Sequence, residues 1–372
     1  MRRSATAPIK ISDTPDMTSN TNHHGARHFN RESVAIFISL AFFGCMAFLS
    51  GCASQGTQKA DHQEAIKQIT QEVYNSAQKA LNPEAMCVIV TEPQTGRILA
   101  MNGNAIRFLT EPASTFKPVS MVAGLEKRKI TPRTKIDCEA GAFPIGKFTL
   151  KDHIPFGELP CDQVLAKSSN IGITKIAMLL EDQDFYDYAR RFGFGQKTGI
   201  GIPGEIPGIL HPPAKWGEQT KPRMAIGQNL AVTPIQIAMA YGALANGGKL
   251  MKPILAGERP HSEGRVCSPK TASFVRNALQ LNASGAGSSP LAQVEGVPVG
   301  GKAGTAQAIN SHGYDPGKYV TMFAGFFPVE HPRYVVVVVI DKADLPPDRN
   351  YGGLVAAPIF SEIAKRITSL PE

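Results

Sequence analysis

The segment Ser114-Thr115-Phe116-Lys117 combines a nucleophile with its own base. A serine hydroxyl is a weak nucleophile at neutral pH and needs a general base within hydrogen-bond reach. Residues three apart on a helix share a face, so we expect the Lys117 amine beside the Ser114 hydroxyl. The amine acts as a base only if burial or a neighbouring cation lowers its pKa, and Lys302 is the candidate cation. The segment therefore predicts covalent catalysis by Ser114.

A second Ser-x-x-Lys, Ser76-Ala77-Gln78-Lys79, shows that the pattern alone has low specificity. It lies in a polar stretch that predicts a helix, because apolar residues recur there at helical spacing: Ile66, Ile69, Val73 and Ala77. No apolar wall is expected to desolvate Lys79, so we interpret this copy as a solvated helix surface.

Two further motifs follow Ser114 in order along the chain. Lys167-Ser168-Ser169-Asn170 contains Ser-x-Asn, and Gly301-Lys302-Ala303-Gly304-Thr305 contains Lys-x-Gly-Thr before a β-rich run. A serine–lysine pair, then Ser-x-Asn, then Lys-x-Gly is the signature of penicillin-recognising serine enzymes. Three matches in order are a much stronger signal than any one of them.

The resemblance covers most of residues 85–370. Ala225-Ile226-Gly227-Gln228, Thr233-Pro234-Ile235-Gln236 and Phe323-Ala324-Gly325-Phe326-Phe327-Pro328 resemble the transpeptidase domain of class B penicillin-binding proteins. The resemblance implies an α+β fold: a five-stranded antiparallel sheet flanked by helices, with an inserted all-helical subdomain. It also implies a peptidoglycan D,D-transpeptidase that forms a serine acyl-enzyme with D-Ala-D-Ala stem peptides or β-lactams and uses no cofactor.

Catalytic roles follow from the same resemblance. Ser114 is the nucleophile and Lys117 its base, while Ser168 relays protons between Ser114 and the leaving amine. Attack creates an oxyanion, which needs fixed hydrogen-bond donors. The backbone N–H groups of Ser114, at a helix start, and Thr305, on a strand edge, are the candidates for this oxyanion hole.

Substrate binding is assigned by the resemblance to four residues: Asn170, Lys302, Gly304 and Thr305. Asn170 bonds the substrate backbone, Lys302 contributes positive charge and Thr305 binds the terminal carboxylate. The family usually has Ser or Thr where this chain has Ala303. The missing hydroxyl removes one hydrogen bond to the substrate carboxylate or the catalytic network, a net loss of about 0.5–1.5 kcal/mol. The sequence therefore makes no prediction of the β-lactam affinity.

An unaltered Lys-Thr-Gly occurs at Lys197-Thr198-Gly199. Glycine and proline recur too often in the residues that follow it for a sheet edge. We therefore predict a loop outside the active site.

The elements that must position these motifs are visible in the hydrophobic pattern. Short apolar runs predict four strands: Cys87–Val90, Arg97–Met101, Val320–Phe327 and Tyr334–Ile340. Helical spacing predicts five helices: Thr115–Lys129, Asn170–Leu180, Phe185–Phe192, Pro234–Asn246 and Leu354–Ile367. The last strand has five consecutive valines and must be buried on both faces. The sheet is therefore assembled from both ends of the domain, with helices from the middle of the chain beside it.

The front of the chain resembles an export signal. Residues 1–52 have a basic lead, an uncharged run from Ser33 to Ser50 and the lipobox-like Leu49-Ser50-Gly51-Cys52. Either Cys52 is lipidated or the segment stays as an uncleaved anchor, and both place the rest on the extracytoplasmic, periplasmic side of a membrane. Residues 53–84 are a polar spacer and helix, and residues 85–372 form the transpeptidase domain.

Class B relatives usually carry a pedestal domain, for which the spacer is too short. We also expect a separate glycosyltransferase, since no region remains for one. The net charge of +8 suits a polyanionic environment, and we expect no nucleic-acid partner.

The six cysteines show no metal-ligand spacing, so no metal site is expected. Cys138 and Cys161 stand in one loop-rich stretch and either pair in an oxidising compartment or remain free thiols.

Competing functions remain open at this stage. A class D β-lactamase is the nearest, because Pro112-Ala113-Ser114 and the residues after it resemble that family's nucleophile region too. A D,D-carboxypeptidase would use the same acyl-enzyme with water as acceptor. A third reading is a β-lactam- or muropeptide-binding sensor or scaffold, in which Ala303 marks decayed catalysis. The lifetime of a penicillin adduct separates these functions.

Overall fold

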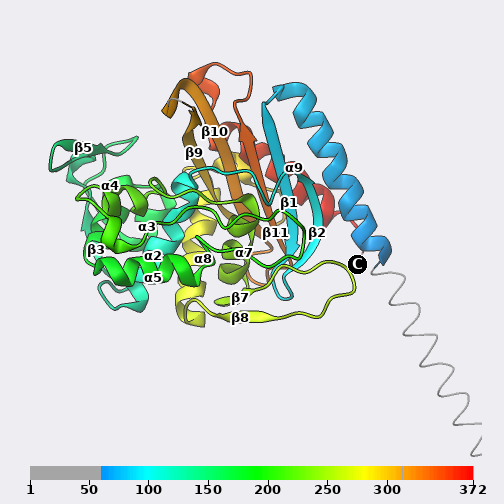
Figure 1. Ribbon diagram of the computed structural model, residues 1–372, viewed down its shortest axis with the longest axis horizontal. Helices are drawn as coiled ribbons and strands as arrows, with labels where there is room; N and C mark the ends of the chain where they lie inside the picture. The colour runs from blue at the N-terminus through cyan, green and yellow to red at the C-terminus, as the bar shows by residue number, and fades with distance from the viewer. Residues whose placement is uncertain (1–59, 312, 372) are drawn as a thin grey trace, which may run out of the picture. The chain divides into compact units, whose positions relative to one another are not determined.

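A five-stranded antiparallel sheet lies at the centre of the protein, in the order β2-β1-β11-β10-β9 (Figure 1). The computed structural model describes residues 60–311 and 313–371. The strands are β1 (Ala85–Glu92), β2 (Arg97–Gly103), β9 (Gly300–Asn310), β10 (Gly313–Phe327) and β11 (Tyr334–Asp341). Both ends of the described chain thus contribute to one sheet, as predicted, with β2 and β9 at its edges.

The valine run of β11 is buried on both faces of the sheet, as predicted. Val335, Val337 and Val339 belong to one hydrophobic core, and Val336 and Val338 belong to the other. All five are at most 1% exposed. The alternation follows from the two-residue period of a strand.

Two helices cover one face of the sheet: the helix over residues 60–81 and α9 (Gly352–Thr368). The predicted apolar stripe of the first helix is buried: Ile66, Ile69, Val73 and Ala77. Arg366 of α9 pairs with Glu72 across the two helices. Ser76 and Lys79 are exposed, as expected of a solvated helix surface.

The opposite face packs against α7 (Pro234–Ala245) and α8 (Pro269–Ala283), and α2 (Lys117–Glu126) packs against α8 within the same hydrophobic core. Beside the sheet, α2 joins a subdomain that Figure 1 shows on the left. Its other helices are α3 (Cys161–Ala166), α4 (Asn170–Met178), α5 (Asp182–Arg191) and α6 (Thr220–Ala225).

This subdomain is not purely helical. Two short antiparallel ribbons, which the sequence analysis did not predict, lie between α2 and α3: β3 (Lys135–Asp137) with β6 (Glu158–Pro160), and β4 (Ala142–Ile145) with β5 (Phe148–Lys151). Three- and four-residue strands are too short for a two-residue period to be recognised in a sequence. The β4–β5 ribbon matters for the site, because its last residue, Lys151, and the next residue, Asp152, bind the Ser-x-Asn loop.

Candidate active site

Ser114 lies in a 3₁₀ turn, Ala113–Phe116, that leads directly into α2. The predicted helix over Thr115–Lys129 therefore begins two residues later than expected. Ala113 has a φ of +47°, a left-handed conformation that is uncommon for a residue with a side chain. Its backbone N–H donates to the Gly227 carbonyl oxygen at 3.0 Å, so the turn is fixed from outside. Ser114 itself is partly exposed between buried neighbours.

The Lys117 side chain is fully buried, with 0% exposure. Its amine donates to the Ser168 carbonyl oxygen at 2.7 Å, to Ser168 Oγ at 3.0 Å and to Asn170 Oδ1 at 2.7 Å. Burial lowers the pKa of Lys117 well below its usual value, and the positive charge of Lys302 lowers it further, while Asp152 opposes the change. The lowered pKa favours the neutral amine, which is the form that a general base requires.

Ser168 connects the nucleophile to this amine. Its hydroxyl lies 3.5 Å from Ser114 Oγ and 3.0 Å from Lys117 Nζ. The sequence analysis expected the amine directly beside the Ser114 hydroxyl, whereas the hydrogen bonds of the structure run from Lys117 to Ser168 and from Ser168 to Ser114. Ser168 occupies this place with a left-handed backbone, φ +61°.

Asp152, at the end of the β4–β5 ribbon, holds the Ser-x-Asn loop. One carboxylate oxygen accepts from Ser169 Oγ at 2.6 Å, and the other accepts from the backbone N–H groups of Asn170, at 2.5 Å, and Ile171, at 3.0 Å. Asn170 Nδ2 also donates to the Lys151 carbonyl oxygen at 2.8 Å. The carboxylate thus satisfies donors at the start of α4, where negative charge is favourable. Sequence reasoning missed Asp152, since no spacing rule links it to residues 17 to 19 positions later.

The third motif lies on edge strand β9. Lys302 is 1% exposed, and burial lowers its pKa to about 7. A Cβ at Gly304 would lie 2.9 Å from Met322 Cγ and 3.1 Å from the Pro112 carbonyl oxygen, so only glycine lets β9 approach the nucleophile segment this closely. Thr305 Oγ1 accepts from the backbone N–H of Gly352 at 3.0 Å, which leaves the hydroxyl hydrogen available for a ligand.

The second Lys-Thr-Gly is a loop, as predicted. The Glu205 carboxylate binds the backbone N–H of Thr198 at 2.5 Å, its hydroxyl at 2.6 Å and the Gly199 N–H at 3.1 Å. The backbone N–H groups and the hydroxyl of this loop thus bind a neighbouring carboxylate, so the loop has a structural role.

Cys138 and Cys161 do not form a disulfide, so that alternative is wrong and the free-thiol alternative holds. Both are buried, and Cys138 Sγ lies 3.3 Å from Ser169 Oγ. Among residues 60–311 and 313–371, no group of side chains could hold a metal ion. Within the same ranges no helix is long and apolar enough to cross a membrane. The lipobox at Cys52 lies outside the described residues.

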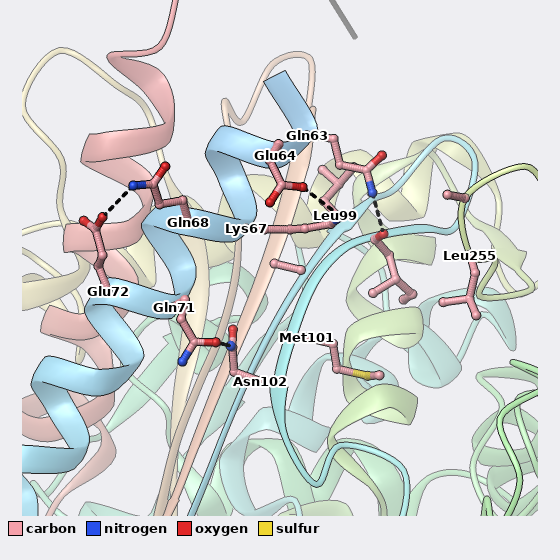
Figure 2. Close-up of a pocket in the computed structure, with 13 residues that line it drawn as sticks. Gln63, Glu64, Lys67, Gln68, Gln71, Glu72, Leu99, Met101, Asn102 and Leu255 are labelled. Carbon is pink, nitrogen blue, oxygen red and sulfur yellow. Dashed lines mark hydrogen bonds and ion pairs between the residues drawn. The ribbon is translucent and has the colours of Figure 1, made fainter. Parts of the chain in front are cut away.

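A cavity of about 680 Å³ lies along β2, at the sheet edge opposite β9 (Figure 2). Polar residues of the 60–81 helix form one wall, and Leu99, Met101 and Leu255 contribute apolar surface. Gln71 and Asn102 join the helix to the strand by a hydrogen bond of 2.5 Å. None of the catalytic motif residues lines this cavity, so its size does not mark the active site.

Comparison with known proteins identifies the family. The penicillin binding protein transpeptidase domain matches residues 86–365. The chain belongs to this family. Penicillin-binding protein PbpB of Mycolicibacterium smegmatis is 31% identical over 91% of this chain and 58% of its own length. The probable peptidoglycan D,D-transpeptidase PbpC of Pseudomonas aeruginosa is 34% identical over 74% of this chain and 52% of its own length. The chain thus spans little more than half the length of these two relatives.

The transpeptidase domain of Burkholderia pseudomallei penicillin-binding protein 3 has the same fold. It superposes with a TM-score of 0.76 and 34% identity, covering 81% of this chain and 92% of that domain. The class B resemblance and the predicted fold class are therefore confirmed.

Proposed function

We propose that this protein is a peptidoglycan D,D-transpeptidase whose Ser114 forms an acyl-enzyme with D-Ala-D-Ala stem peptides and with β-lactams. The observation that carries the proposal is the continuous path from Ser114 Oγ through Ser168 Oγ to the buried Lys117 amine. Relatives bearing the name peptidoglycan D,D-transpeptidase support the same activity.

Acylation transfers one proton and exchanges one bond. Ser114 Oγ attacks the carbonyl carbon between the two D-alanines, and its proton passes through the Ser168 hydroxyl to the neutral Lys117 amine. The C–N bond then breaks, and the leaving amine of the terminal D-alanine takes the proton back by the same path. In the second half-reaction the amine of a neighbouring stem peptide attacks the ester carbonyl carbon and the C–O bond to Ser114 breaks. The proton that the amine loses returns through Lys117 and Ser168 to Ser114 Oγ.

The remaining motif residues bind and stabilise. The backbone N–H groups of Ser114 and Thr305 are the proposed oxyanion donors, each worth about 10²–10³ in rate. Lys302 and the Thr305 hydroxyl bind the terminal carboxylate. Gly304 lets the strand approach the site, and Asn170 bonds the substrate backbone while its side-chain oxygen holds Lys117.

We also propose that the protein works in the cell envelope, anchored on the extracytoplasmic side of a membrane through lipidated Cys52. A separate glycosyltransferase supplies the glycan strands. Mass spectrometry of the mature protein tests the anchor: the expected N-terminus is a lipid-modified Cys52, and an unmodified chain that retains residues 1–51 contradicts it.

Intact-mass analysis after benzylpenicillin treatment tests the activity. We expect a long-lived adduct in the wild type and in the control Ser76→Ala, and none in Ser114→Ala. Rapid loss of the adduct as hydrolysed penicillin favours a β-lactamase, and no adduct in any variant favours a scaffold. With a D-Ala-D-Ala peptide and an acceptor amine, a cross-linked product distinguishes transpeptidation from carboxypeptidation.

A further inference from the structure

Glu111 lies three residues before Ser114, and its carboxylate joins three segments around the nucleophile. The residue is 7% exposed. Its Oε1 accepts from the backbone N–H of Asn229 at 2.9 Å. The Tyr314 hydroxyl donates to the same carboxylate, 3.1 Å from Oε1 and 3.2 Å from Oε2. No step of the proposed reaction uses this buried carboxylate, so its hydrogen bonds need another explanation.

The first of these contacts fixes the chain on one side of the nucleophile. The turn that contains Asn229 also accepts the Ala113 N–H through the Gly227 carbonyl oxygen at 3.0 Å. A Cβ at Gly227 would lie 2.0 Å from the Ala113 carbonyl oxygen, so the turn and the nucleophile segment are in close contact. Residues 111 and 113 are therefore both held by one turn.

The second contact reaches the β9–β10 arm, which is residues 307–310 of β9 and 313–319 of β10. In this arm Gln307, Ile309 and Asn310 lie opposite Tyr319, Tyr314 and Gly313, beyond the part of β10 that pairs with β11. Tyr314 lies opposite Ile309 in this arm, and both are largely exposed, at 45% and 57%. An arm with little apolar burial of its own depends on specific contacts for its position. The Tyr314 hydroxyl supplies one to Glu111.

The paired strands β9 and β10 therefore contact the nucleophile segment at two points, one on each strand. Gly304 packs against Pro112, and Tyr314 of the paired strand bonds to Glu111. Thr305 lies between these points along β9. The distance between the Ser114 and Thr305 backbone N–H groups depends on both contacts, since a rotation of β9 about Gly304 would move Thr305.

We propose that Glu111 is a positioning residue, which acts through Tyr314 and the Asn229 turn to hold Thr305 and Ser114 at the spacing that oxyanion binding requires. This inference rests on the proposed function, because it concerns the same acylation step. Burial raises the pKa of Tyr314 to about 12, and the Glu111 charge raises it too, so the hydroxyl keeps its proton and donates. Burial also raises the pKa of Glu111, opposed by its hydrogen bonds and by Arg223.

The test is the acylation of the full-length chain in detergent by a fluorescent penicillin, with the rate constant k2 separated from the dissociation constant of the non-covalent complex. Tyr314→Phe removes only the hydroxyl, and we expect k2 to fall about threefold to tenfold, the fold-change of one net hydrogen bond. Tyr319→Phe is the matched control, because it makes the same change on the same strand, where the hydroxyl has no hydrogen bond to any residue that the structure describes. We expect wild-type k2 and an unchanged dissociation constant for the control.

Substitutions at Glu111 provide a second test. Glu111→Ala should lose at least as much k2 as Tyr314→Phe, and Glu111→Gln, which keeps an acceptor oxygen, should recover part of the loss. The inference is wrong if Tyr314→Phe has the k2 of the wild type. It is equally wrong if Tyr314→Phe has a lower Tm but an unchanged k2, measured at a temperature where the variant is folded. A wild type that forms no adduct overturns the proposed function itself, so the two failures are distinguishable.

Discussion

Removal of the Ser168 hydroxyl tests the proton path most directly. Ser168→Ala breaks both links of the path, 3.0 Å to Lys117 and 3.5 Å to Ser114. The other two hydrogen bonds of the amine, to the residue 168 carbonyl oxygen and to Asn170 Oδ1, remain. Lys117 therefore stays in place but loses its connection to the nucleophile.

The expected magnitude follows from the role of this hydroxyl. Positioned proton transfer contributes about 10²–10⁴ to a rate. We expect k2 for benzylpenicillin to fall at least about 100-fold, which corresponds to roughly 2.7 kcal/mol of activation free energy. Stopped-flow measurement of k2 gives the rate, and urea denaturation gives the free energy of unfolding.

A glycine variant separates chemistry from backbone effects. Residue 168 has a φ of +61°, where glycine is favoured over alanine. Ser168→Gly should lose as much k2 as Ser168→Ala, although its free energy of unfolding should be equal or higher. If k2 of Ser168→Ala stays within about threefold of the wild type, a difference of about 0.7 kcal/mol, Lys117 deprotonates Ser114 without Ser168, and the proposed path is wrong.

Three further predictions concern other parts of the site. Ala303→Ser restores the hydroxyl that the family usually has, and it should raise the second-order rate of β-lactam acylation by about twofold to tenfold; an unchanged rate would show that residue 303 does not contact the ligand. Acylation needs a neutral Lys117 and a charged Lys302. The second-order rate constant of acylation should therefore rise with pH as Lys117 loses its proton, and it should fall above about pH 7, where Lys302 loses its proton. A pH profile without a falling limb would exclude the charge of Lys302 from ligand binding. Asp152→Asn removes an anion that accepts from Ser169 and from Asn170, so urea denaturation should show a loss of about 1–3 kcal/mol. Because Asp152 raises the pKa of Lys117, the rising limb should also move to lower pH; a limb that moves to higher pH contradicts this electrostatic assignment.

Much of the site could be predicted from the sequence because its chemistry is encoded by residue type and order. A serine three residues before a lysine, followed by Ser-x-Asn and Lys-x-Gly, is visible without a structure. Four of the five sheet strands were equally visible, β11 above all, since its five valines leave no polar face and require burial on both sides. The fifth strand, β9, was not predicted from its pattern. The stripe of Ile66, Val73 and their neighbours likewise gave the first helix.

The features that the sequence did not reveal are contacts between remote segments and elements too short to show a period. Spacing placed Lys117 beside Ser114, yet the hydrogen bonds of its amine go to residues more than 50 positions away. The two-stranded ribbons of the helical subdomain escaped detection for lack of length.

The sequence by itself determined the candidate catalytic side chains, and its periodicity gave four strands of the sheet and the first helix. The tertiary structure alone decided that Ser168 stands between nucleophile and base, that Asp152 holds the Ser-x-Asn loop, and that Cys138 and Cys161 stay apart as thiols. The physical reason is range: periodicity is a property of neighbouring residues, whereas desolvation of a lysine and the direction of a hydrogen bond depend on which distant segments pack around it.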